Sequence, residues 1–247
     1  MNVENQIKKI NELVQKGNIP SYKLALDKIV NLQKKIPPNS FIQNLTGIIN
    51  QRLGKLNNAI KNYEKSHELD NKNISPLNNL AYVYESLKKW GEAKMYFEKI
   101  ENLDPNNLIY LINLSNFYFS LNQIEKSNKS LEKAMKIEPN SRNVLYNLAR
   151  NYANEGRFEE SVKLIKKVIV LEKDFFPAHI QLVNFNKKVD QDHLNQLYNL
   201  LENKEIAEEK KADLYFALAN MYEKMSKDEE FFKYLNKANK LYKKINE

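Results

Sequence analysis

The chain has 247 residues, enough for one extended repeat domain or two small globular domains. It contains no cysteine, which excludes disulfides and thiolate chemistry, and only 5 glycines and 7 prolines, which excludes a linker or a turn-rich β protein. The formal net charge is +8, but the basic residues are mostly lysines interleaved with glutamates. That pattern is typical of solvated helix faces, so a nucleic-acid partner is disfavoured.

The N-terminal residues 1–10 carry charges and amides instead of an apolar stretch, and every later apolar run is short. A membrane-spanning helix needs about eighteen or more consecutive apolar residues. We therefore expect neither a signal peptide nor a membrane span, and a cytoplasmic protein.

A repeat with a fixed period of about 34 residues organises most of the chain. Residues 3–39 predict a first helix-turn-helix unit with a long turn at Gly17. Regular units follow at residues 40–73, 74–107, 108–141 and 142–175, and one small residue marks each second helix: Ala25, Ala59, Ala93, Ser127 and Ser161. Residues 176–206 break the period, and residues 207–245 restore a hairpin. This periodicity predicts an all-α solenoid of stacked hairpins, in a single domain over residues 1–247.

The residue types within each unit add a family resemblance. In the unit 74–107, Leu80, Ala81 and Tyr84 mark the first helix, and Ala93 and Phe97 mark the second. The stretch SPLNNLAYVYESLKKWGEAKMYFEKIENLDPNN resembles the tetratricopeptide repeat. This resemblance covers nearly the whole chain and implies a right-handed superhelix whose first helices line a concave groove.

The C-terminal segment has a narrower resemblance. It is similar to the end of the repeat region in bacterial tetratricopeptide proteins that continue into a sulfotransferase domain. The matching features are Asp192-His193-Leu194, Phe216-Ala217-Leu218, Phe231 and Ala238-Asn239-x-Leu241. The chain has no glycine-rich phosphate-binding loop. The resemblance therefore implies the scaffold part of such a system without its catalytic domain.

The first helices also share a column of amides that recurs with the repeat period. Its members are Asn79, Asn113 and Asn147. At about 100° per residue, Asn79 lies about 160° from the middle of the core stripe, so the column faces away from the hairpin core. The neighbours expected on the same face are Asn78, Tyr82, Asn116, Asn143 and Arg150. A primary amide offers two donors and an acceptor, so this face is expected to hold an extended peptide backbone.

The column resembles the asparagine ladder of the O-linked N-acetylglucosamine transferases, which implies peptide-backbone contact for its three members. Leu45 and Ala217 replace asparagine in two other hairpins, so the ladder is short. The alternative is that these asparagines reflect the repeat consensus and an asparagine-rich composition. Arg150 also has two interpretations, because it could bind a carboxylate of the partner or be an ordinary surface charge.

No pattern predicts catalysis, a metal site or a cofactor. His67, His179 and His193 are far apart and form no metal-binding pair, and we expect His193 to cap a helix or pack in the core. We therefore predict a non-catalytic scaffold that binds a protein or peptide. The alternatives are the substrate-presenting module of a sulfotransferase or glycosyltransferase system, with the catalytic domain absent from this chain, and RNA binding through lysines.

Overall fold

The computed structural model describes residues 2–186, 189–202 and 206–246, so parts of the expected irregular segment, residues 187–188 and 203–205, lie outside the description. Within the described ranges the chain forms helices and turns and no strand, which confirms the predicted all-α fold of helical hairpins. The helices are α1 (Val3–Gln15), α2 (Ile19–Gln33), α3 (Ser40–Arg52), α4 (Leu56–Leu69), α5 (Ser75–Ser86), α6 (Trp90–Leu103), α7 (Leu108–Ser120), α8 (Ile124–Ile137), α9 (Arg142–Asn154), α10 (Phe158–Leu171), α11 (Phe176–Phe185), α12 (Gln191–Glu202), α13 (Glu208–Lys224) and α14 (Asp228–Asn246).

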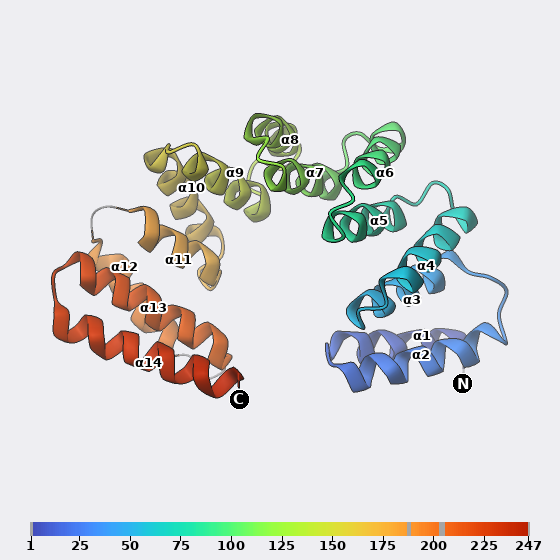
Figure 1. Ribbon diagram of the computed structural model, residues 1–247, viewed down its shortest axis with the longest axis horizontal. Helices are drawn as coiled ribbons and strands as arrows, with labels where there is room; N and C mark the ends of the chain where they lie inside the picture. The colour runs from blue at the N-terminus through green and yellow to red at the C-terminus, as the bar shows by residue number, and fades with distance from the viewer. Residues whose placement is uncertain (1, 187–188, 203–205, 247) are drawn as a thin grey trace. The chain divides into compact units, whose positions relative to one another are not determined.

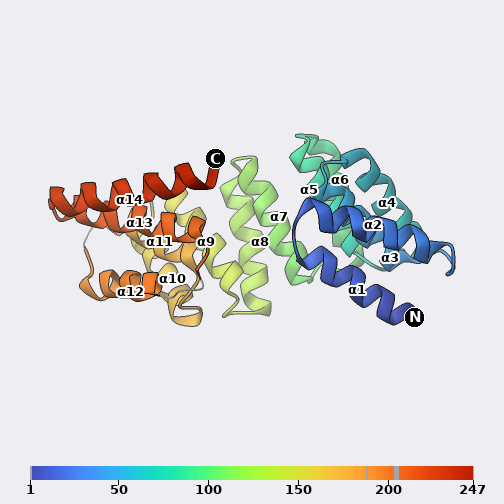
Figure 2. The ribbon, with the colours of Figure 1, turned by 90° about the horizontal axis from the view of Figure 1, so that it is seen from below.

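The helices belong to two compact units, residues 1–113 and residues 114–247, and the division falls within α7. In unit 1, α1 packs on α2, α3 on α4 and α5 on α6, and each pair contacts the next (Figure 1). In unit 2, α9 packs on α10, α10 on α11 and α11 on α13, and the last two helices, α13 and α14, run side by side in both views (Figure 2). That the repeats form one continuous domain stays a prediction.

The turns inside the hairpins share one backbone geometry. Gly54 (φ 72°) and Gly156 (φ 78°) end first helices in the left-handed conformation, as expected for glycines after a helix. Lys88 (φ 58°) and Asn122 (φ 56°) adopt the same conformation at the same repeat position. In each case the next residue's N–H bonds back across the turn, for example from Lys89 to the carbonyl of Tyr84 at 2.9 Å. The turn is therefore set by the hairpin and tolerates residues other than glycine.

The hairpin cores are built from the columns of small and large residues. The small residues of the second helices, including Ala59 and Ala93, are completely buried. In the hairpin of α3 and α4, Gly47 faces the ring of the buried Tyr63 so closely that no Cβ would fit. The Tyr63 hydroxyl donates a hydrogen bond to Gln51 Oε1 at 2.6 Å, which holds the ring in this position. A small residue is thus required where a large one packs opposite.

The irregular segment of unit 2 is held by the hairpin that follows it. Side chains of α11 and α12 share a core with α13 and α14, including Val183, Leu197 and Leu218. Lys224, at the end of α13, donates to the carbonyls of Val183 and Asn186 (3.0 Å for the latter), near the end of α11, where carbonyls lack partners within their own helix. None of the helices within the described residues has the length and hydropathy needed to cross a bilayer.

Candidate peptide-binding site

The amide column forms hydrogen bonds between neighbouring first helices in unit 1. Asn79 Nδ2 on α5 donates to Asn44 Oδ1 on α3 at 3.0 Å. Asn113 Nδ2 on α7 donates to Asn78 Oδ1 on α5 at 3.1 Å. In both pairs the sequence separation is 35, one more than the repeat period. Asn79 and Asn113 are therefore each bonded to the amide one position earlier in the preceding repeat.

These pairs leave part of each amide available. Asn79 uses one of its two N–H groups, and no described residue donates to its carbonyl oxygen. The side chains of Asn79 and Asn113 are half-buried, so they can be reached from solvent while their orientation is held by the neighbouring helix. Asn44 was not among the residues predicted for the site. Its position, one repeat period before Asn78, was the signal that could have identified it.

Exposed apolar side chains lie beside the amides of unit 1. Tyr82 on α5 is 61% exposed, Ile109 on α7 is 64% exposed and Phe41 on α3 is 49% exposed. Tyr82 lies four residues after Asn78, Ile109 lies four residues before Asn113, and Phe41 lies three residues before Asn44. On a helix this spacing places side chains next to one another on one face. We call the set Phe41, Asn44, Asn78, Asn79, Tyr82, Ile109 and Asn113 the unit 1 amide face.

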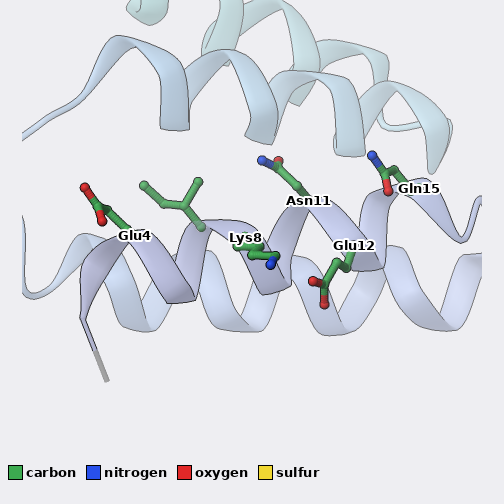
Figure 3. A pocket seen from close by; sticks show the side chains of 6 residues that line it. Glu4, Lys8, Asn11, Glu12 and Gln15 are labelled. Carbon is green, nitrogen blue, oxygen red and sulfur yellow. The ribbon is translucent and has the colours of Figure 1, made fainter.

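A shallow hollow marks the first helix of unit 1. It has a volume of about 510 Å³ and is lined by α1 residues Glu4, Ile7, Lys8, Asn11, Glu12 and Gln15. Figure 3 shows Glu4, Asn11 and Gln15 rising from the same side of α1. Unlike the unit 1 amide face, this surface carries charged groups of both signs at a spacing of four residues, which favours mutual ion pairing along the helix.

The third member of the amide column belongs to unit 2 and differs from the other two. Asn147 is only 8% exposed, and no hydrogen bond of its side chain joins it to a neighbouring first helix within the described residues. Asn143 is exposed, and its Oδ1 accepts hydrogen bonds from Arg142 Nε and Nη2, both at 3.2 Å. The amide column of the sequence is therefore divided between the two units.

Arg150 is the most distinctive polar group on the first helices of unit 2. Its Nη2 donates to Asn116 Oδ1 at 2.8 Å, and the guanidinium carbon lies 3.9 Å from the ring centroid of Phe119. Its Nε is buried without a hydrogen-bond partner. Burial lowers the pKa of Arg150 from its usual value, and Tyr146 opposes this shift. The guanidinium is therefore a partly desolvated cation that no carboxylate of the described residues neutralises.

Two of the three histidines, which are far apart in sequence, meet in unit 2. His179 Nδ1 lies 3.1 Å from His193 Nε2, and the rings stack with centroids 5.3 Å apart. His179 Nε2 lies 2.8 Å from the carbonyl oxygen of Lys173, which can only accept, so this nitrogen carries the proton. His179 Nδ1 must then accept from His193 Nε2–H. The predicted packing role of His193 holds, and its partner was not foreseen.

The tetratricopeptide repeat model matches residues 74–107, 109–141, 143–175 and 212–245, more than half of the chain. The chain belongs to the tetratricopeptide repeat family. Proteins of this family generally mediate protein–protein interactions, and their repeats typically act as non-catalytic scaffolds. A search of curated proteins found no match.

Solved structures share the fold at low sequence identity. A tetratricopeptide repeat protein from Parabacteroides merdae is 18% identical with a TM-score of 0.65, covering 97% of this chain and 93% of its own. Pseudomonas aeruginosa PilF is 14% identical with a TM-score of 0.66, covering 82% and 91%. PilW, a type IV pilus biogenesis factor, is 19% identical with a TM-score of 0.65, covering 79% and 90%. The resemblance of the C-terminal segment to sulfotransferase-linked proteins gains no support from these comparisons.

Proposed function

We propose that this tetratricopeptide repeat protein is a non-catalytic scaffold that binds an extended segment of a partner protein along its first helices. In unit 1 the binding surface is the unit 1 amide face, with Asn79 and Asn113 as backbone anchors and Tyr82 as a neighbour that sets preference. Asn78, expected at the site from the sequence, is buried and contributes by orienting the amide of Asn113. The observation that carries this proposal is the pairing of amides between adjacent first helices, because it fixes the remaining amide groups in one orientation.

Orientation matters because ordering a free side chain opposes binding. Immobilising a flexible side chain on binding costs about 0.5–1.5 kcal/mol of free energy. Because Asn79 and Asn113 are already held by their hydrogen bonds to Asn44 and Asn78, less of that free energy is lost when a partner binds. Four backbone hydrogen bonds to Asn79 and Asn113 at about 1 kcal/mol each give about 4 kcal/mol. That energy alone corresponds to a dissociation constant of about 1 mM. Side-chain contacts of the partner must therefore supply the rest of the affinity.

In unit 2 the proposed contacts are Asn116, Asn143, Asn147 and Arg150. The partly desolvated guanidinium of Arg150 supports binding of a carboxylate of the partner. A carboxylate would neutralise the positive charge and accept hydrogen bonds from the N–H groups of the guanidinium. Phe119 holds the guanidinium plane from one side. Asn147 would need a small movement to reach a ligand, since it is nearly buried.

The test is a selection from a random peptide library followed by affinity measurement. Peptides selected on the unaltered protein are labelled, and binding is followed by fluorescence anisotropy. The double variant Asn79→Ala, Asn113→Ala is expected to bind about a thousandfold more weakly, as loss of the four hydrogen bonds, about 4 kcal/mol, implies. The matched control is Asn57→Ala, Asn58→Ala, which removes two exposed amides of the second helix α4. Equal affinity of the two double variants would refute the proposed anchors.

No observation of the structure favours the substrate-presenting module of a sulfotransferase or glycosyltransferase system, which stays an expectation from sequence. It would add a catalytic partner to the same binding surface and would not change the test above.

A further inference from the structure

The helices that carry the unit 1 amide face are almost free of charge, in a chain that is 28% charged. The helices α3 and α5 each carry one charged residue, Arg52 and Glu85, close to their C-terminal ends. The part of α7 that belongs to unit 1 carries none. The second helices alternate acids and bases, for example Glu92, Lys94 and Glu98 in α6. In these hairpins charge is thus concentrated on the second helix.

The nearly uncharged first helices also expose bulky apolar groups. Phe41, Tyr82 and Ile109 stand on three successive first helices, each at least 49% exposed. Solvent-exposed apolar side chains beside amides of fixed orientation form a surface that is part apolar and part polar, and covering its apolar part with a partner is energetically favourable. The amides can satisfy a peptide backbone, and the apolar groups can cover side chains that an extended peptide presents on alternate sides.

From this partition we infer that the unit 1 amide face takes an uncharged, extended segment with bulky apolar side chains, an inference that rests on the proposed function. A charged side chain docked there would lose its hydration, and on α3, α5 and the start of α7 the one charge near these amides is Glu85, one turn beyond Tyr82 at the end of α5. The face therefore selects by excluding charge as much as by apolar attraction. Charged residues of the partner are accommodated only beyond this face, for example at Glu4, Lys8 and Glu12 of α1.

The experiment uses capped peptides of about nine residues that alternate serine with leucine or phenylalanine. Matched peptides carry lysine, glutamate or serine at the apolar positions, and binding to the full chain is measured by anisotropy. The apolar peptides are expected to bind saturably, and the lysine and glutamate peptides at least about tenfold more weakly. Equal or tighter binding of either charged peptide would overturn the inference.

Protein variants locate the binding. The double variant Phe41→Ser, Ile109→Ser is expected to weaken the apolar peptides by about tenfold. The matched control is Met95→Ser, Leu103→Ser, which removes two exposed apolar groups from the second helix α6 and is expected to change affinity less than about twofold. Equal weakening by both variants would mean non-specific adhesion and would overturn the inference. So would helix formation by the bound peptide in circular dichroism, or self-association of the chain that is lost in Phe41→Ser, Ile109→Ser.

Failure of this inference can be told apart from failure of the proposed function. If the library selection returns charged peptides whose binding depends on Asn79 and Asn113, the scaffold function stands and the preference for uncharged segments is wrong. If no library or designed peptide binds, both fail. Peptide binding by the Tyr82→Glu variant gives a second measure. Its added carboxylate should make the variant bind the lysine peptides more tightly than the glutamate peptides. If the variant shows no such preference, the inference is wrong.

Discussion

The close approach of Gly47 to Tyr63 allows us to predict how much a larger residue at position 47 would lower the free energy of unfolding. A Cβ at residue 47 would lie 2.4 Å from Cε1 and 2.5 Å from Cδ1 of Tyr63, far inside normal contact. The ring cannot swing away freely, because it is completely buried and its hydroxyl is bonded to Gln51. Overpacking of this kind costs about 1–3 kcal/mol, whereas alanine gains up to about 1 kcal/mol over glycine within a helix. We expect Gly47→Ala to lower the free energy of unfolding by about 1–2 kcal/mol.

A second substitution tests whether the ring is the cause. At the equivalent positions of unit 2, Ala149 and Ile165 lie in the same buried core cluster, so a Cβ at this position is compatible with a smaller aliphatic side chain opposite. In a Tyr63→Leu background, Gly47→Ala should therefore become neutral or stabilising by up to about 1 kcal/mol. The matched control is Gly91→Ala in α6, which meets no atom within 4 Å and should not destabilise.

The assay is urea unfolding followed by tryptophan fluorescence. Trp90 is the only tryptophan of the chain and lies in unit 1, as Gly47 does, so its signal reports the unit under test. The reasoning is refuted if Gly47→Ala is as stable as Gly91→Ala, or if its loss of stability persists unchanged in the Tyr63→Leu background.

Two further predictions concern unit 2. Burial lowers the pKa of His193 from 6.5 to about 4, so its contribution to stability is complete above about pH 6.5 and is lost as the pH falls toward 4. By pH 5 the loss should reach about 2 kcal/mol in urea unfolding followed by circular dichroism, with the Trp90 transition of unit 1 as an internal reference that shows no matching loss. Asn151 is completely buried and donates to Ser127 Oγ at 2.8 Å. Asn151→Ala should cost about 1–3 kcal/mol in the same assay, while Asn154→Ala, at an exposed position of the same helix, should stay within about 0.5 kcal/mol; equal effects would show that the buried bond contributes nothing.

The amino-acid sequence by itself determined which segments are helical and where the hairpins turn. The repeat period brings the same local choices back in each unit, and local choices of this kind depend on residues within one or two helical turns. Gly54 and Gly156 could be predicted as left-handed turn residues because glycine favours that conformation. At Lys88 and Asn122 the side chain favours this conformation less than glycine does, and the packing of the hairpin imposes it.

Only the tertiary structure decided which polar groups meet. The sequence predicted the column of Asn79 and Asn113, yet the bonds to Asn44 and Asn78 depend on how neighbouring first helices are offset. The pairing of His179 with His193 depends likewise on the packing of two helices that follow the break in the period. Such contacts join residues far apart in the chain, and their geometry is set by the large side chains between the helices, which no local pattern describes.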